Sequence, residues 1–531
     1  MKRLFAILLE KQIPRLHPCG AQKRCALRAT AALGMTAFFL IAYAWPVSAH
    51  IGSPDVFLEG NAGPYKLFVT VRVPQVIPGI AEIEIRSESN KVNEIRIAPM
   101  QLTGPGSQYA PAPEAAQRSK DDPQFFRGSL WLMEFGSLQV RIEAAGTAGQ
   151  GLLAIPIPAV AQRMLPMRRS LGLLLFGLML VLALAMVSIV AAAVREGNVP
   201  PGAPVPVARK RRVRFASVTA TFVVAAVLAI GGLWWRADAR QYASHIYNAP
   251  AIEAAINSNG QLILRAGPLH MASGNPRRPA DVIDFKDLIV DHEHLMHLFL
   301  VRSPGMDVFW HLHPERAGSG SFIQNLPAMP AGQYQIFADV VLSNGFPVTM
   351  IGQIDLPSAI AGKPLTGDDS GIAGNSIPSE TNAPAEFSFP DGGHMVWNRD
   401  AQPVQPLHAG VPLILHFRVT DPSGRPAADL EPYMGMPAHA AIVRSDGSVF
   451  AHVHPTGSVP MASFELAQAS LPGASNGAAL APMNMPQMTG DKVAPDISIP
   501  YGFPKAGLYR VFVQIKRAGQ IETAYFDAAV R

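Results

Sequence analysis

Cysteine is almost absent from the sequence. Of 531 residues only Cys19 and Cys25 are cysteines, and both precede the first long apolar segment. Disulfide bonds and thiolate metal sites are therefore excluded from all later parts of the chain. Histidine and methionine remain as the nitrogen and sulfur ligands for a transition metal, a usage that suits an oxidising compartment outside the cytoplasm.

Charged residues are also scarce, at 16% of the chain, and the formal net charge is +5. Much of the positive charge lies beside apolar segments and forms no long basic face, so nucleic acid is not an expected partner. The sequence has no glycine-rich dinucleotide fingerprint and no phosphate loop, and no Ser/His/Asp set or acid couple has convincing spacing. We therefore expect a binding protein without catalytic residues, rather than an enzyme.

Two long apolar segments, residues 171–194 and 215–235, are each long enough to cross a hydrocarbon core of about 30 Å as a helix. The basic segment between them, 195–214, belongs in the cytoplasm by the positive-inside rule. Residues 1–49 have a basic start, an apolar stretch and a final small-residue site, which is typical of a signal peptide or of an uncleaved signal anchor. The sequence thus predicts two or three transmembrane helices in the inner membrane of a bacterium, with the large flanking regions on the periplasmic side.

Proline and glycine are abundant, with 48 and 45 residues, which indicates many short turns rather than long helices. Residues 50–160 contain runs of alternating polarity, typical of half-buried strands, at 66–73, 81–86 and 138–143. This first exported region is expected to form a small β-sandwich.

The remainder of the chain is internally repeated. The motif from Tyr334 to Phe337 recurs from Tyr509 to Phe512, in two regions that a Gly/Ser/Pro/Ala-rich linker at 357–386 joins. Two related sandwiches in tandem, at residues 251–356 and 387–531, explain the repeat. The predicted fold is mainly β, with three exported modules of the immunoglobulin-like or cupredoxin-like sandwich type on the membrane anchor.

The repeat includes a histidine-bearing hairpin. His297–Arg302 leads through a turn into Val308–Pro314, and His439–Arg444 leads through a different turn into Val449–Pro455. Counting outward from each turn puts the first histidine of a hairpin opposite the last, and the histidine two residues before the last on the same face. Each hairpin is therefore expected to present three imidazoles together: His297, His311 and His313 in the first, and His439, His452 and His454 in the second.

Three imidazoles on one face suit copper, zinc or another first-row transition metal. Preceding residues extend the two sets, because His292 and His294 in one copy correspond to Met434 and Met436 in the other. Soft thioether ligands favour Cu(I), so the second copy is predicted to prefer Cu(I), while the first tolerates Cu(II) or zinc. The alternative is a hydrogen-bonded polar cluster that serves the fold.

A methionine-rich stretch within the last region offers a further set of soft ligands. Met483, Met485 and Met488 lie in a Pro/Ala/Gly-rich segment, where converging thioethers could gather Cu(I). The alternative is an adaptable apolar lid.

The first exported region resembles the YtkA-like family of exported β-sandwiches, through Gly63-Pro64-Tyr65, Phe126-Arg127-Gly128 and the segment from Glu134 to Leu138. The two later regions resemble domains grouped with YtkA-like or CopC-like sandwiches, which tend to accompany copper and heavy-metal efflux. The resemblance implies metal handling. If cleavage follows Ala49, it also implies a copper-chelating amino terminus at His50, although no second histidine of this region would complete that site.

The leading functional hypothesis is a membrane-anchored copper-binding protein that acts in sequestration, relay or tolerance, with a metal transporter or other membrane protein as partner. A second hypothesis is a scaffold that binds a transporter or oxidase-assembly partner without metal. A third is a zinc hydrolase, for which Glu293 or Glu315 would supply the base.

Overall fold

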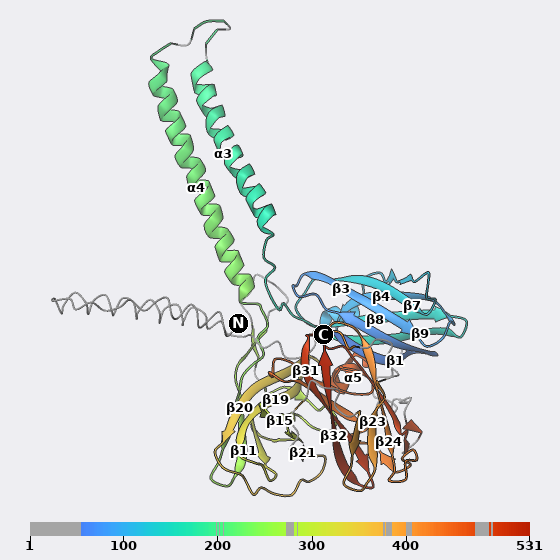
Figure 1. Ribbon diagram of the computed structural model, residues 1–531. Coiled ribbons are helices and arrows are strands. Elements are labelled where there is room, and N and C mark those ends of the chain that lie inside the picture. Colours follow the sequence, from blue (N-terminus) through green and yellow to red (C-terminus); the bar gives the residue numbers. More distant parts are fainter. Residues whose placement is uncertain are drawn as a thin grey trace, which may run out of the picture. The chain divides into compact units, whose positions relative to one another are not determined.

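The computed structural model describes residues 55–531, apart from 198, 201, 205, 272–280, 284, 375–377, 379–384, 400–405, 473–487 and 490–491. The predicted signal at 1–49, His50, Met483 and Met485 lie outside the described residues. The chain is mainly β, with 47% strand, and its strands lie in several sheets (Figure 1).

The N-terminal region comprises β1–β9. One sheet has the order β1-β2-β3-β7-β6 and the other β5-β4-β8-β9, and residues of both sheets enclose a common apolar core. Strand β3 alternates buried and exposed residues, as a half-buried strand does. The elements are β1 (Val56–Ala62), β2 (Tyr65–Arg72), β3 (Gly79–Ser87), β4 (Val92–Gln101), η1 (Pro105–Gln108), β5 (Glu114–Ala115), β6 (Gln117–Arg118), β7 (Phe125–Leu132), β8 (Gly136–Gly146) and β9 (Gly149–Ala159).

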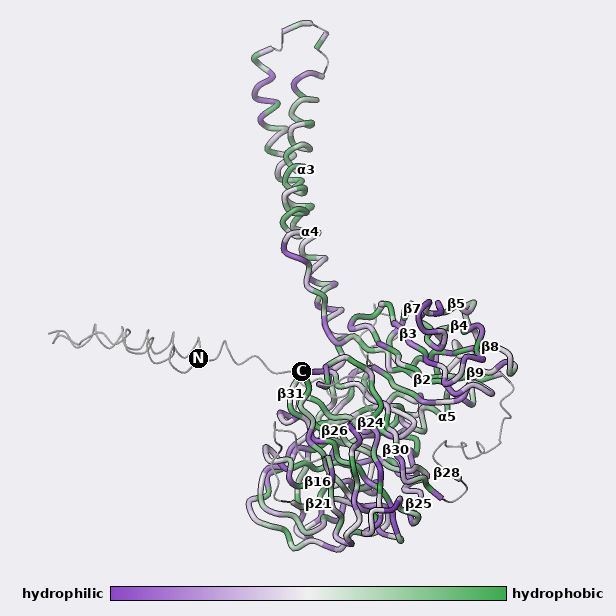
Figure 2. The backbone as a smooth tube through the Cα atoms, turned by 45° about the vertical axis from the view of Figure 1, so that its right-hand side comes forward, coloured by the Kyte–Doolittle hydropathy of each residue, from purple (hydrophilic) through white to green (hydrophobic). Residues whose placement is uncertain are grey.

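Two helices follow, α3 (Arg169–Glu196) and α4 (Arg209–Ala243), and both are long and apolar enough to cross a membrane. They contain the predicted spans 171–194 and 215–235, and none of their residues is buried. Figures 1 and 2 show them side by side, and Figure 2 shows apolar residues in their middle parts, between hydrophilic ends. Their exposed apolar surface is compatible with a lipid environment.

The middle region comprises β10–β21. Its sheets have the orders β14-β19-β15-β16-β21, with β20 beside β19, and β10-β11-β18-β17, and a small β12-β13 ladder is separate. The two larger sheets enclose one core. The strands are β10 (Ile252–Ile256), β11 (Gln261–Ala266), β12 (Leu269–Met271), β13 (Asp281–Ile283), β14 (Leu288–Ile289), β15 (His297–Ser303), β16 (Val308–Leu312), β17 (Glu315–Gly318), β18 (Ser321–Asn325), β19 (Gly332–Leu342), β20 (Pro347–Leu356) and β21 (Ser370–Ala373).

The C-terminal region comprises β22–β32. Its sheets have the orders β22-β23-β24-β30 and β25-β31-β26-β27, with β32 beside β31, and again they enclose one core. The elements are β22 (Glu386–Ser388), β23 (His394–Trp397), β24 (Leu413–Thr420), β25 (Leu430–Glu431), β26 (His439–Arg444), β27 (Phe450–Val453), α5 (Met461–Ala469), β28 (Met488–Thr489), β29 (Lys492–Val493), β30 (Asp496–Tyr501), β31 (Gly507–Arg517) and β32 (Gln520–Val530).

The segment 357–386, predicted as a linker, includes a strand that pairs with the middle region. It contains β21, which pairs with β16 and places Asp369 next to the end of the first histidine hairpin. The sequence prediction missed this strand because its Ser-Gly-Ile-Ala composition carries little strand preference.

The middle and C-terminal regions share an apolar boundary, the smaller core formed between them. Phe309 stacks on Phe512 with ring centroids 4.1 Å apart, and Phe450 stacks on Phe337 at 4.3 Å. These four residues are two equivalent pairs of the repeat, so each region offers the same surface to the other. The boundary is therefore isologous, because an approximate twofold rotation relates the two regions of this single chain.

Candidate metal centre

Both histidine hairpins have the predicted register. Leu298 pairs with Leu312 in the first and Ala440 with Val453 in the second, so the flanking histidines face each other as counted from the turns. The turns before the hairpins are also equivalent: Asp291–His294 and Tyr433–Met436 each close with a backbone bridge. His292 and Met434, the corresponding tip residues, share a left-handed φ of 49°.

The first cluster is the predicted set of His297, His311 and His313, whose candidate ligand nitrogens all lie within 4.8 Å of one another. His297 and His311 come from the paired strands β15 and β16, and His313 follows the end of β16. The exposed fractions of His297 and His311 are only 2% and 0%, so bulk water does not solvate their rings.

Hydrogen bonds fix which nitrogens of this cluster carry protons. The Nε2 of His297 donates to the carbonyl oxygen of Asp291 at 3.1 Å, and the Nδ1 of His311 donates to the amide oxygen of Gln514 at 2.8 Å. A chain of hydroxyl groups sets the amide orientation of Gln514. Tyr433 donates its only hydroxyl proton to the carbonyl oxygen of Asp368, so Ser370 donates to Tyr433 and its own oxygen accepts from the Gln514 nitrogen. In neutral imidazoles this leaves the lone pairs of His297 Nδ1 and His311 Nε2 facing each other at 3.1 Å.

The third imidazole is oriented by a carboxylate. The Nδ1 of His313 donates to Asp369 Oδ1 at 3.1 Å, and Asp369 is itself held by Gln324 and by the backbone amide of His313. The buried Nε2 of His313 has no hydrogen-bond partner in the described part of the chain. A carboxylate behind a histidine whose other nitrogen is free is the usual arrangement around a protein metal ion.

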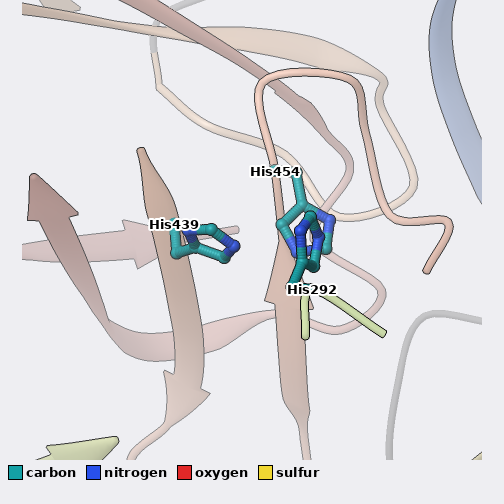
Figure 3. Close-up of side chains that lie close together, drawn as sticks. All are labelled: His292, His439 and His454. Carbon is teal, nitrogen blue, oxygen red and sulfur yellow. The ribbon is translucent and has the colours of Figure 1, made fainter. Parts of the chain in front are cut away.

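The second cluster differs from the prediction. It consists of His292, His439 and His454, again with ligand nitrogens within 4.8 Å, and His452 is not a member (Figure 3). His292 belongs to the middle region, whereas sequence reasoning placed it with the first cluster. His292 reaches the histidines of the C-terminal region because the turns Asp291–His294 and Tyr433–Met436 meet at the boundary, where His292 Nδ1 donates to the carbonyl oxygen of Met434 at 2.9 Å.

His452 and His294 lie beside the clusters. The ring centroid of His452 is 5.2 Å from that of His297 and 4.5 Å from that of His454, so it neighbours both clusters. His294 stacks on His313 at 3.9 Å and pairs with Asp368 at 3.2 Å. The eight predicted histidines therefore form one continuous group, rather than one separate site in each region.

The methionines have a smaller place in this group than predicted. Met434 supplies a backbone carbonyl, and Met436 is buried in the same turn, but no contact of either thioether with the clusters is recorded among the described residues. Of the methionine-rich stretch, Met488 lies in β28, and its side chain is outside the described part. The predicted Cu(I) site at Met483, Met485 and Met488 stays a prediction.

Two polar residues that the sequence analysis did not identify support the histidines across the boundary. Gln514 binds His311, and Asp339 Oδ2 lies 3.6 Å from the Nδ1 of His452. Gln514 and Asp339 are equivalent residues of the repeat, each two positions after the stacked phenylalanine of its strand. Pairing the strands of each repeat would have identified them, because Asp339 lies opposite His297 and Gln514 lies opposite His439.

Burial keeps six of these imidazoles neutral. It lowers the pKa of His297 to about 4. Burial, together with neighbouring histidines, lowers the pKa of five others well below the ordinary histidine value: His311, His313, His439, His452 and His454. Burial also raises the pKa of Asp339 to about 6. Neutral imidazoles are the form that binds metal ions.

The carboxylates proposed as a hydrolytic base do not join the centre. Glu293 and Glu315 are both exposed, and no hydrogen bond or ion pair between either of them and a cluster histidine is recorded among the described residues. The geometry gives no support to the zinc hydrolase hypothesis.

Residues 400–531 match the model of a domain of unknown function, DUF8832, which covers most of the C-terminal region. This match neither supports nor tests the resemblance to YtkA-like or CopC-like domains. No curated protein matches the chain.

Three solved structures give remote likenesses. Alpha-2-macroglobulin of Escherichia coli is 9% identical with a TM-score of 0.18, and the alignment covers 89% of this chain but only 23% of that one. The ICAM-5 D1–D4 ectodomain fragment is 8% identical over 88% of this chain and 77% of that one, with a TM-score of 0.15. A putative membrane anchored protein from Corynebacterium diphtheriae is 8% identical over 90% and 94%, with a TM-score of 0.13. These scores assign neither fold nor function.

Proposed function

We propose that this chain is a membrane-anchored metal-binding protein whose buried histidine centre holds copper. Three sandwich modules, one for each pair of sheets, would lie on the periplasmic side of a bacterial inner membrane. The basic segment between α3 and α4 supports this orientation by the positive-inside rule.

One observation carries the metal proposal: the facing lone pairs of His297 Nδ1 and His311 Nε2, 3.1 Å apart. Two acceptor nitrogens at this distance repel each other unless a cation lies between them. Two imidazole nitrogens bound tetrahedrally at about 2.0–2.1 Å from one ion are about 3.3 Å apart, which is close to the observed separation. The free Nε2 of His313 completes a three-nitrogen set.

The hydrogen-bonded alternative, in which the histidines serve only the fold, explains this arrangement less well. A polar cluster that exists for stability satisfies its donors and acceptors. Here five histidines have buried ring nitrogens without partners in the described part of the chain: His292, His313, His439, His452 and His454. Unsatisfied polar atoms gathered in one place are a cost to folding that a bound ion removes.

Copper is preferred over zinc because the ligands are neutral imidazole nitrogens, and because affinity for copper exceeds that for zinc at nitrogen sites. The deep burial of the ligands fits holding an ion, as in sequestration or relay, better than processing a substrate on it. A metal transporter in the same membrane is the partner that this role would require.

Metal analysis of the detergent-solubilised full chain tests the proposal. Copper should copurify or bind stoichiometrically, and replacing His297→Ala together with His313→Ala should remove the ion from the first cluster. His416→Ala is the matched control, because this histidine bonds to Ser498 on β30, apart from the clusters. Metal-free wild-type protein, or equal metal content in both variants, would overturn the metal function and favour the scaffold.

A further inference from the structure

The three imidazoles of the second cluster form a nearly regular triangle. The ring centroids of His292, His439 and His454 are separated by 4.9, 4.8 and 4.9 Å. Three imidazoles that bind one ion through nitrogens at about 2.0–2.1 Å place their ring centres about 5 Å apart. The spacing is therefore that of a ligand set around a single ion.

Each of these rings has a free nitrogen for that ion. The Nδ1 of His292 is occupied by the carbonyl of Met434, which leaves its buried Nε2 without a partner, and His439 and His454 also have buried ring nitrogens without hydrogen bonds in the described residues. The carbonyl bond fixes the tautomer of His292, so that its lone pair is on Nε2.

The charges around the two clusters differ. The first cluster has Asp369 in direct contact with His313 and Asp368 on the neighbouring His294. Asp339 lies opposite His297 of this cluster and beside His452, which neighbours both clusters. In the second cluster the supporting group of His292 is a neutral carbonyl, and no carboxylate contact of its three rings is recorded among the described residues.

Two acidic groups lie near the second cluster but do not contact it. Glu465 on α5 acts on His292 only through space, and the carboxylate of Asp291 is bound by the backbone amide of Ala462. Because the cost of burying an ion rises with the square of its charge, a site without paired carboxylates favours a monovalent ion over a divalent one.

We propose that His292, His439 and His454 form a second metal site that binds Cu(I) across the boundary between the middle and C-terminal regions. The assignment rests on the proposed copper function and adds a second ion, its oxidation state and its position. Because His292 comes from one region and its two partners from the other, the ion links the two regions, and its binding stabilises their docking.

The test is an anaerobic Cu(I) titration of the full chain in detergent against a chromophoric chelator. Wild-type protein should bind one Cu(I) at each cluster, and His292→Ala should lose the ion of the second. His294→Ala is the matched control: it changes a histidine of the same turn that belongs to neither cluster, and it should leave the second site intact. His454→Gln provides a second variant of the same site, and near-ultraviolet circular dichroism checks that all variants are folded.

The link between the regions has its own readout. Cu(I) should raise the thermal unfolding temperature of wild-type protein more than that of folded His292→Ala, because only the wild-type site joins the regions. Zn²⁺ titration should fill the first cluster alone, since the second lacks paired carboxylates.

The outcomes separate the two proposals. Wild-type protein that binds no copper refutes the proposed function and this inference together. Copper that disappears with the first-cluster variant but is unchanged in folded His292→Ala and His454→Gln overturns only the second site. A second Zn²⁺ that His292→Ala removes would overturn the assignment of a monovalent ion.

Discussion

Replacing Gln514→Leu should weaken metal binding at the first cluster, although Gln514 does not belong to that cluster. Its amide oxygen accepts the Nδ1 proton of His311 at 2.8 Å and so keeps the lone pair on Nε2, the atom that faces His297. Leucine has a similar volume but no acceptor. The His311 proton then moves to Nε2, where it can donate to His297 Nδ1.

The size of the effect follows from that tautomer change. The new imidazole hydrogen bond stabilises the metal-free form by about 1 kcal/mol, and a metal ion must displace it. Loss of an outer hydrogen bond to a ligating histidine costs about 10–100-fold in metal affinity, or about 1.4–2.8 kcal/mol. We therefore expect the dissociation constant of the first site to rise by about 10–100-fold.

Competition with a chelator of known affinity measures this change. Gln514→Glu retains the acceptor and should keep the affinity at or above the wild-type value. Thr523→Val, which removes only one contact of the Gln514 amide nitrogen, should have a smaller effect. An affinity of folded Gln514→Leu within a factor of about two of wild type would refute the tautomer argument, because the expected loss is far larger.

Three further predictions concern stability and topology. Because burial lowers the folded-state pKa of His297 to about 4, below the ordinary value of 6.5, protonation favours the unfolded chain as pH falls from about 6.5 toward 4. Chelator-treated protein should therefore lose about 2 kcal/mol of unfolding free energy from this residue between about pH 6.5 and 5, and a free energy of denaturant unfolding that does not change across this range would contradict the pKa shift. Phe450→Ala removes the ring stacked on Phe337 and should cost about 3–5 kcal/mol, compared with less than about 0.5 kcal/mol for the exposed Tyr109→Ala; equal unfolding midpoints would argue against a packed boundary. In a chain without its native cysteines, Pro204→Cys between the helices should react with a membrane-impermeant thiol reagent only after the inner membrane is opened, whereas Ser258→Cys should react in the periplasm, and the reverse pattern would invert the topology.

The hairpins could be predicted from the sequence because their information is local. Turn residues and the two-residue period of a strand were sufficient to pair His297 with His313 and His439 with His454, and the backbone register agrees. The apolar spans were equally accessible, since their length and lack of charge are properties of a continuous segment.

What could not be predicted depends on docking between regions. His292 joins the second cluster, and Gln514 supports the first, only because two surfaces distant in sequence meet at stacked phenylalanines. Asp369 lies in a polar segment whose pairing with β16 is a tertiary effect. Helix α5, whose Ala462 amide binds the carboxylate of Asp291, lies in a segment that offered no helical period to recognise.

The twofold boundary has a consequence for how its halves can differ. In a dimer of identical subunits every substitution occurs on both sides of the interface, so equivalent residues on the two sides always stay identical. Covalent fusion removes that constraint. Asp339 contacts His452 where Gln514 contacts the equivalent His311, and His292 occupies the turn position that Met434 occupies in the other region. Each of the two histidine clusters can therefore change independently of the other, while the stacked phenylalanines between the regions are kept.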